Sequence, residues 1–190
     1  GIFDFMDKVV QSIPPGSDHL ICTPWMLGER CPVSSTTTRA TLFNITMLHT
    51  REHLMRSVYE GIGYNLRWIL ENYKNDYGFS CNEFRIIGGG ALDDAWMQII
   101  ADITGKSFSV VKDPRNAGAV GAAVVALIGL GELEGFQQAK EFVKIAKHYE
   151  PNKDNRKIYD NLFARYKQIY KSLEKAYKCA NGERFRGEEK

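Results

Sequence analysis

Apolar residues recur three and four positions apart in three stretches of the chain, the spacing of one buried helix face. The stretches are residues 1–12, residues 51–73 and part of residues 151–180, and each predicts a helix. Gly61 and Gly63 interrupt the second stretch at a cost of about 1 kcal/mol each relative to alanine. We expect another element or a ligand to pass close to them, and we prefer close helix packing. The predicted buried stripe of this helix consists of Leu54, Val58, Ile62, Leu66, Ile69 and Tyr73.

Shorter apolar runs lie between these helices and have the length of buried strands. They cover residues 20–22, 84–87 and 108–111. After the last run, the small-residue stretch AVGAAVVALIGLG predicts a further helix that begins near Gly118. Helices and strands thus alternate along the chain, which predicts an α/β layered domain.

Three consecutive glycines, at residues 88–90, follow the second predicted strand, and Asp93 stands at the N-cap position of the next helix. Glycine lets the backbone approach a ligand without a Cβ in the way, and a helix N-terminus offers unpaired N–H donors. We interpret the block as a nucleotide or phosphate contact; the alternative is a tight turn from strand to helix. The lysine of a P-loop and the spacing G-x-G-x-x-G are both missing.

The charge balance narrows the range of partners. With 25 Lys and Arg against 23 Asp and Glu, the net charge of +2 gives no reason to expect nucleic acid as a partner. No apolar run reaches membrane-spanning length, so we expect no membrane association. Scattered cysteines without a C-x-x-C pair favour free thiols in a cytoplasmic protein over a structural zinc site. The cysteines are Cys22, Cys31, Cys81 and Cys179.

Residues 49–53 read HTREH, the H-x-x-E-H pattern of inverted zinc proteases. That chemistry needs His49 and His53 as zinc ligands one helical turn apart, with Glu52 activating a water. Thr50 is a better N-cap than His49 is a helical residue, so we place His49 outside the helix and expect the two rings not to share a face. We prefer capping or surface histidines, and a metallohydrolase is the alternative.

Several long blocks, in the right order, resemble the C-terminal portion of the FGGY family of carbohydrate kinases, and most closely its xylulokinase branch. They are TPWMLGERCP, HTREHLMRSVYEGIGYNLRWIL, GGGALDDAWMQIIADITGKSF, GAVGAAVVALIGLG and the tyrosine-rich helix of residues 159–170. The resemblance implies an incomplete ribonuclease-H-like, actin-type ATPase domain with C-terminal helices. Residues 1–135 would be the C-terminal part of the ATP-binding domain, residues 136–180 its helical extension, and residues 181–190 a disordered tail.

The resemblance also implies a binding site for ATP, because the glycine block of this family touches the adenosine or α-phosphate part of the nucleotide. The matching positions here are Gly89, Gly90 and Ala91. Asp93 or Asp94 falls where relatives have Ser or Asn, and a carboxylate there would accept from ribose or adenine but repel phosphate. We expect Gly90→Val to collide with the nucleotide. Ala40 and Asn44 also depart from the family, which usually has glycine at these positions.

The groups that carry out the chemistry in this family lie upstream of the region that the chain matches. They include an aspartate base, a phosphate loop and the sugar domain, so we assign no catalytic residue and no metal ligand to this chain. The resemblance implies that the intact protein transfers the γ-phosphate of ATP, with Mg²⁺, to a ketopentose such as D-xylulose, and that this chain alone is inactive. Ribulose or gluconate as the substrate and a non-catalytic actin-like binding module are the alternatives, and a homodimer is left open.

Overall fold

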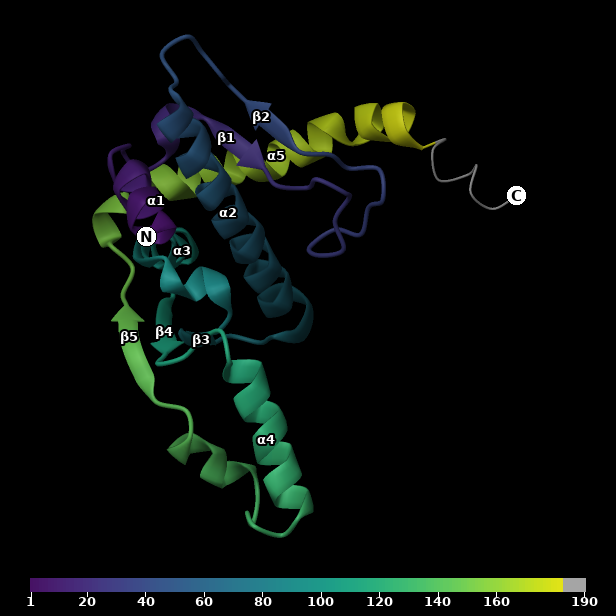
Figure 1. Ribbon diagram of the computed structural model, residues 1–190. Coiled ribbons are helices and arrows are strands. Elements are labelled where there is room, and N and C mark those ends of the chain that lie inside the picture. Colours follow the sequence, from purple (N-terminus) through teal and green to yellow (C-terminus); the bar gives the residue numbers. More distant parts are fainter. Residues whose placement is uncertain (183–190) are drawn as a thin grey trace.

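The computed structural model describes residues 1–182 of the chain, without the side chains of residues 2–4. A three-stranded sheet has the order β3-β4-β5. In it β3 (Glu83–Ile86) runs parallel to β4 (Ser107–Val111), and β4 runs antiparallel to β5 (Ile145–Tyr149). A separate antiparallel pair consists of β1 (Ile21–Thr23) and β2 (Thr41–Phe43). Figure 1 shows this pair above the larger sheet.

Helices connect and cover these strands (Figure 1). Within the described part of the chain the α-helices are α1 (Ile2–Gln11), α2 (Arg51–Tyr77), α3 (Asp94–Thr104), α4 (Ala117–Gly129) and α5 (Arg156–Asn181). Short 3-10 helices are η1 (Ser17–His19), η2 (Gly89–Leu92), η3 (Phe136–Glu141) and η4 (Lys153–Asn155). Helix α2 contacts β1 and α3, α5 contacts α3, and α3 contacts β4 and β5. The α/β arrangement predicted from the sequence is thereby confirmed.

The main hydrophobic core lies where α2, α3 and α5 meet β1. Trp25, Tyr64 and Tyr166 are fully buried there, and the rings of Trp25 and Tyr166 meet edge to face with centroids 5.3 Å apart. A smaller cluster, which includes Met97 and Phe108, joins α3 to the three-stranded sheet. The sheet is therefore held to the helices chiefly through α3.

The buried face of α2 differs from the predicted stripe by a rotation of the helix. Its deepest positions include Arg56, Glu60 and Tyr64, whereas Leu54 and the rest of the predicted stripe are half-buried or exposed. The polar pair can be buried because its charges are matched. The Glu60 carboxylate accepts from Arg56 Nε and from the backbone N–H of Gly16, each at 2.8 Å. Burial raises the pKa of Glu60. Because this polar pair takes the deepest positions of α2, the predicted apolar stripe of the helix is only partly covered.

The two glycines inside α2 mark close contacts, as the sequence predicted. A Cβ at Gly61 would collide with the backbone carbonyl oxygen of Cys22 in β1. A Cβ at Gly63 would lie 2.8 Å from Cδ1 of Ile103 in α3. Both glycines therefore let neighbouring elements approach α2 closely.

Three further expectations are modified. The central helix continues to Tyr77, four residues beyond the predicted end. Residues 136–180, expected to form a helical extension, also contain β5, because Lys147 and His148 hide its strand character in a polar sequence. The disordered tail was expected at residues 181–190, but α5 continues to Asn181. Residues 183–190 lie outside the described residues. Over residues 1–182, no helix combines the length and the apolar character that crossing a membrane requires.

Candidate functional site

The glycine block forms a bare turn directly after β3. Gly88 has a φ of 100°, a backbone conformation that favours glycine, and its N–H donates to the carbonyl oxygen of Pro114 at 2.7 Å. A Cβ built on Gly88 or Gly89 would meet no atom within 4 Å. A Cβ on Gly90 would instead collide with the ring of Trp96. The open side of the turn is thus at Gly88 and Gly89, and Gly90 is required by the packing of Trp96.

The backbone of this turn offers hydrogen-bond donors. Gly89 and Gly90 are the first residues of η2, so the helix itself contains no carbonyl group for their N–H groups. Paired backbone donors beside an open space suit a phosphate oxygen. Ala91, the third predicted contact residue, is buried, and its N–H donates to the carbonyl oxygen of Gly88 at 3.3 Å. Ala91 therefore holds the shape of the turn.

Asp93 lies inside the protein. It is 1% exposed and caps α3, where its Oδ1 accepts the N–H of Trp96 at 2.8 Å. Its Oδ2 accepts the hydroxyl of Tyr59 at 2.7 Å. The next donor, the N–H of Ala95, is taken by Asp7 Oδ1 at 2.9 Å. The protein's own carboxylates thus accept the first free N–H groups of α3, and these two donors are not available to a phosphate group.

Asp94 is also engaged within the chain, although half of its side chain is exposed. Its carboxylate accepts from Lys147 Nζ at 2.7 Å and from the hydroxyl of Tyr149 at 2.6 Å, both in β5. Partial burial opposes ionisation, but these hydrogen bonds outweigh it and hold the pKa of Asp94 below its ordinary value. The predicted contacts of Asp93 and Asp94 with a nucleotide stay predictions. Asp93 is buried, whereas the half-exposed carboxylate of Asp94 can accept a further hydrogen bond.

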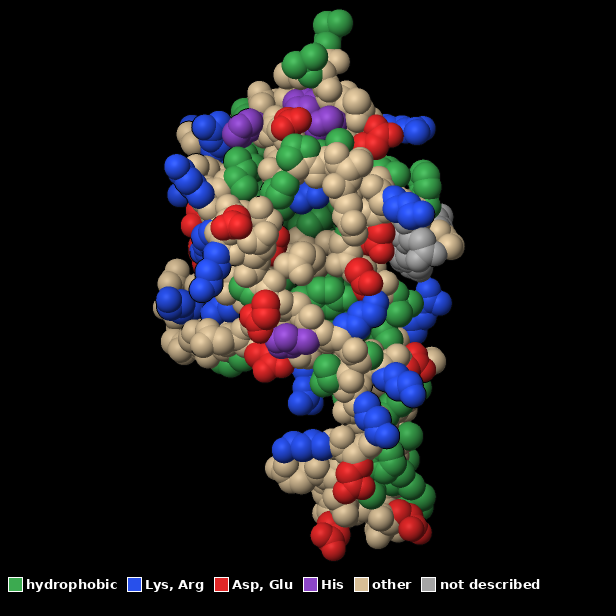
Figure 2. All heavy atoms as spheres, turned by 90° about the vertical axis from the view of Figure 1, so that its left-hand side faces the viewer, with side chains coloured by type: hydrophobic (Ala, Val, Ile, Leu, Met, Phe, Trp, Pro, Cys, Tyr) green, Lys and Arg blue, Asp and Glu red, His purple; other side chains and the backbone are tan. Residues whose placement is uncertain are grey.

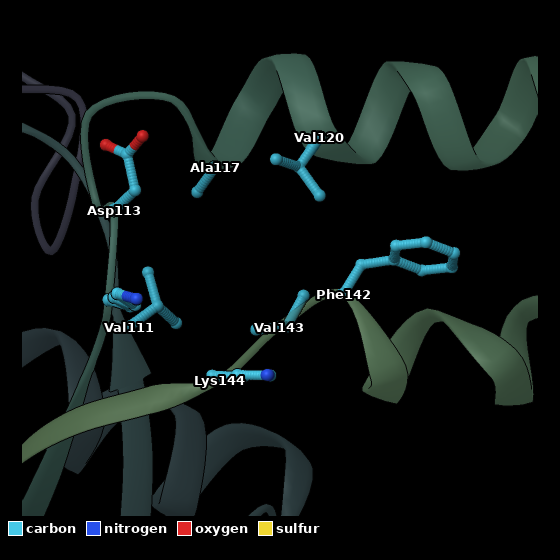
Figure 3. Close-up of a pocket in the computed structure, with 8 residues that line it drawn as sticks. Val111, Asp113, Ala117, Val120, Phe142, Val143 and Lys144 are labelled. Carbon is cyan, nitrogen blue, oxygen red and sulfur yellow. The ribbon is translucent and has the colours of Figure 1, made fainter.

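A pocket of about 260 Å³ lies close to the glycine turn, between the end of β4 and the start of α4 (Figure 3). Pro114, whose carbonyl group receives the N–H of Gly88, lies just after the pocket residue Asp113. The walls combine apolar side chains with two lysines. They are Val111, Lys112, Asp113, Ala117, Val120, Phe142, Val143 and Lys144. Sequence reasoning missed this pocket, because η3 and β5 bring distant residues to it.

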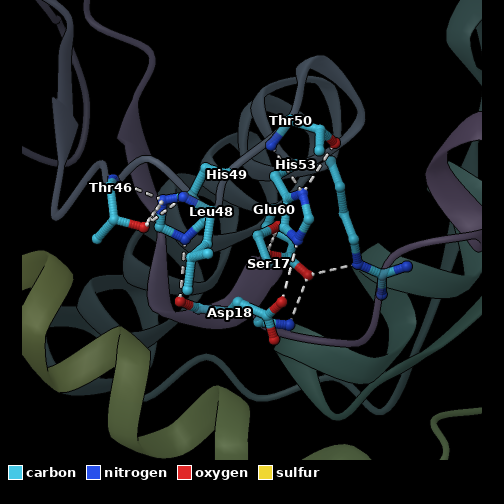
Figure 4. A network of polar contacts seen from close by, with 10 residues as sticks. Ser17, Asp18, Thr46, Leu48, His49, Thr50, His53 and Glu60 are labelled. Atoms are coloured by element: carbon cyan, nitrogen blue, oxygen red, sulfur yellow. Dashed lines mark hydrogen bonds and ion pairs between the residues drawn. The ribbon is translucent and has the colours of Figure 1, made fainter.

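His53 forms a capping box with Thr50 at the start of α2, and His49 holds the loop that precedes the helix (Figure 4). Nδ1 of His53 accepts the N–H of the N-cap residue Thr50 at 3.1 Å, and Nδ1 of His49 accepts the N–H of Thr46 at 2.9 Å. The Nε2 atoms lie 3.0 and 3.2 Å from oxygens of Asp18. His49 lies outside the helix, as predicted, so the two rings do not share a helix face. The loop nevertheless brings the rings close together, with centroids 5.4 Å apart.

These contacts leave the motif without the geometry of a zinc site. Both rings use Nδ1 to accept a backbone N–H and direct Nε2 to Asp18, so each ring already has partners at both nitrogens. Glu52 pairs instead with its exposed neighbour Arg51. Among residues 1–182, no three His, Cys, Asp or Glu side chains converge in a way that could hold a metal ion.

Asn44, one of the departures from the family pattern, has a left-handed backbone with a φ of 70°. Asparagine is one of the few non-glycine residues that adopts this conformation readily. Its side-chain Nδ2 also donates to the carbonyl oxygen of His19 at 3.2 Å. Asn44 can therefore replace a glycine here without a change of the chain path.

Comparison with known proteins decides the family. The profile of the FGGY family of carbohydrate kinases, C-terminal domain, matches residues 4–130. The chain belongs to this family. The xylulose kinase of Bacillus subtilis (strain 168) is 35% identical over 170 residues, which cover 88% of this chain and 34% of that protein. The gluconokinase of the same organism is 28% identical over 175 residues, which cover 92% of this chain and 34% of that protein.

Solved structures of this FGGY family agree with the fold described above. The crystal structure of xylulose kinase from Rhodospirillum rubrum aligns with a TM-score of 0.79 at 28% identity, over 92% of this chain and 34% of that chain. Gluconate kinase from Lactobacillus acidophilus aligns with a TM-score of 0.80 at 27% identity, over 90% of this chain and 35% of that chain. The chain thus has part of the actin-type, ribonuclease-H-like fold and spans about a third of the length of its curated relatives.

Proposed function

We propose that this FGGY chain is the later part of the ATP-binding half of a sugar kinase, and that the turn at Gly88–Ala91 receives the adenosine or α-phosphate part of ATP. The observation that carries the proposal is the open space beside Gly88 and Gly89, next to two backbone donors. ATP supplies the phosphoryl group that is transferred. The residues of this chain bind and orient the nucleotide through main-chain N–H groups.

The adjacent pocket fits the remaining chemistry of a nucleotide. Val111, Val120 and Phe142 provide apolar walls for a flat base, and Lys112 and Lys144 provide positive charge near phosphate. Asp93 has a positioning role in this proposal, since its hydrogen bonds fix the start of α3 behind the turn. The aspartate base and the residues that bind Mg²⁺ would belong to the part of the protein outside this chain, and the chain alone would be inactive.

D-xylulose is the first candidate acceptor, because relatives named xylulose kinase reach 35% identity. Gluconate is the second candidate, since relatives named gluconokinase match over the same region at 28% identity. A cytoplasmic location belongs to the same proposal. A coupled ADP-release assay of the full-length protein against D-xylulose, ribulose and gluconate would separate these substrates. If none of the three sugars causes ADP release, a non-catalytic binding module would be favoured.

The binding site itself is tested by Gly89→Val in the full-length protein. The new side chain would enter the open space, so we expect the Kd for ATP to rise by about tenfold or more. The melting temperature should change little, because no protein atom lies within 4 Å of the added Cβ. Isothermal titration calorimetry with ATP and a thermal melt of the same sample measure both quantities.

Gly135→Val is the matched control. Gly135 has an extended backbone with a φ of 169° and equally open surroundings, but it lies in the loop before η3. The Gly135→Val protein should bind ATP with the same Kd as the wild type. Gly90→Val is unsuitable as a binding test, because it would displace Trp96. Equal ATP affinity in Gly89→Val and in the wild type would contradict the proposed site.

A further inference from the structure

Trp96 holds the inner side of the glycine turn by packing. Its ring lies against Gly90, where an added Cβ would collide with it. The indole Nε1 is buried and makes no hydrogen bond within the described part of the chain. Packing and the start of α3 therefore fix the position of this ring, and a shift of either would displace the backbone at Gly90.

Tyr59 of α2 contacts both the ring of Trp96 and the cap of α3. The ring centroids of Tyr59 and Trp96 are 5.3 Å apart, and their planes are inclined by 36°. The hydroxyl of Tyr59 donates to Asp93 Oδ2 at 2.7 Å, and Asp93 Oδ1 accepts the backbone N–H of Trp96 at 2.8 Å. The N–H of Asp93 donates to the carbonyl oxygen of Gly90 at 3.2 Å. Tyr59 is thus connected to the turn by two routes, through the Trp96 ring and through Asp93.

The carboxylate of Asp93 depends on this hydroxyl because it is buried. With 1% of its surface exposed, Asp93 has little access to water. The neighbouring carboxyl group of Asp7, from α1, brings no positive charge to it. A buried carboxylate needs hydrogen-bond donors or a positive charge around it. Burial and the hydrogen bond with Asp93 raise the pKa of Tyr59, so its hydroxyl keeps the proton that it donates.

We propose that Tyr59 is a positioning residue of the nucleotide site, which sets the backbone of the glycine turn through Trp96 and Asp93 without touching the ligand. This inference rests on the proposed function, because that function places ATP at the turn. Main-chain N–H groups bind a phosphate oxygen only when they point at it, so a small rotation at Gly89 and Gly90 misdirects them. The affinity for ATP therefore depends on a hydroxyl group of α2.

Tyr59→Phe in the full-length protein removes the hydroxyl and keeps the ring. The Oδ2 atom of Asp93 then loses its donor in a buried place, so the carboxylate moves and the start of α3 shifts with it. We expect the Kd for ATP, measured by isothermal titration calorimetry, to rise about fivefold. In the kinase assay the KM for ATP should rise by the same factor, and the KM for the sugar should stay unchanged. An unchanged Kd for ATP would overturn the proposal.

Tyr159→Phe is the matched control. The hydroxyl of Tyr159 also donates to a buried carboxylate, that of Glu60, at 3.1 Å, but this pair lies in the main core. Both variants should lower the melting temperature by about 3 °C, because each leaves a buried carboxylate with one donor fewer. Only Tyr59→Phe should weaken ATP binding. An equal loss of ATP affinity in both variants would assign the effect to a general loss of stability and overturn the proposal.

A second substitution tests whether the hydroxyl acts through Asp93. Asparagine at this position keeps an oxygen for the N–H of Trp96 and carries no charge that requires the hydroxyl. In the Asp93→Asn background, Tyr59→Phe should change the Kd for ATP by less than about twofold. A fivefold change in both backgrounds would overturn the proposal. If Tyr59→Phe alone does not fold, the double variant decides, since it should fold and bind ATP as Asp93→Asn does, and its failure to fold would overturn the proposal.

Fluorine NMR of protein labelled with fluorotryptophan reports the turn without a nucleotide. The Trp96 resonance is the one that is missing in Trp96→Phe. A shifted Trp96 resonance in Tyr59→Phe, together with ATP binding that survives Gly89→Val, would contradict the nucleotide site and leave the effect of Tyr59 on the turn in place. ATP binding that is lost in Gly89→Val and unchanged in Tyr59→Phe would support the nucleotide site and contradict the role of Tyr59.

Discussion

Three carboxylates meet at the first turn of α3, and they interact with one another as well as with the helix. Asp93 caps the helix, Asp7 reaches the N–H of Ala95 from α1, and Asp94 follows the cap. Burial, the hydrogen bond with Asp93 and the nearby negative charges raise the pKa of Asp7 to about 6. The folded protein therefore holds a proton on Asp7 more tightly than the unfolded chain, in which the pKa is close to 3.8.

Asp7→Asn should stabilise the chain at pH 7.5 and lose this advantage in acid. Because the pKa of Asp7 is raised in the folded state, its ionisation destabilises the fold above pH 6, and protonation relieves the cost as the pH falls from about 6 to 4. Asn keeps an oxygen acceptor for Ala95, and after allowance for solvent screening we expect a gain of about 1 kcal/mol in the free energy of unfolding at pH 7.5. Urea titrations at pH 7.5 and pH 4.5 measure the difference.

Asp154→Asn is the control for this titration. Asp154 is exposed and lies far along the chain, in η4, so its replacement should have little effect at either pH. A gain in Asp7→Asn that is equal at pH 7.5 and pH 4.5 would contradict a proton-linked cause. It would indicate that the amide simply packs better than the carboxylic acid.

At the scale of the element, α2 shows how a glycine can outweigh helix propensity. Gly61→Ala would gain about 1 kcal/mol of propensity. The added Cβ would collide with the carbonyl oxygen of Cys22, a backbone atom of β1 that cannot easily move. We expect a net loss of about 2 kcal/mol in the free energy of unfolding, measured by urea denaturation.

Gly63→Ala is the matched comparison within the same helix. Its Cβ would meet the end of the Ile103 side chain, which can rotate away, so the loss of stability should be clearly smaller. Equal stability changes in Gly61→Ala and Gly63→Ala would show that contact with backbone or side chain does not decide the outcome.

The same helix shows what the sequence could and could not predict. Period and capping residues predicted its start at Arg51 after Thr50, because these signals are local. They did not predict which face is deepest, because Arg56 and Glu60 become buried only when Tyr159 and Gly16 arrive from distant parts of the chain. The sequence also did not predict that Gly89 faces open space whereas Gly90 packs against Trp96, because this difference depends on where the Trp96 ring lies in the fold.

At the scale of the whole molecule, α4 combines an apolar sequence with a largely exposed surface, and Figure 2 shows hydrophobic side chains along this lower part of the molecule. Helices that are apolar on all sides are stable in a protein when another element covers them. In this chain α4 contacts η3, and most of its surface is open. In the full-length protein, residues outside this chain would supply the cover, so the same substitution should have opposite effects in the 190-residue chain and in the full-length protein.

The double substitution Ala122→Lys and Val125→Lys tests this difference of sign. In the 190-residue chain both positions are exposed, so the lysines should raise solubility, measured as the concentration at which light scattering begins. In the full-length protein the same lysines would be buried without partners, and the melting temperature should fall by about 5 °C or more. Glu132→Lys and Gln137→Lys, which add positive charge at exposed positions near the helix without entering its apolar surface, should leave the melting temperature unchanged. A full-length protein that tolerates the α4 lysines as well as these controls would show that α4 is exposed to solvent there too. Its apolar sequence would then require a separate partner.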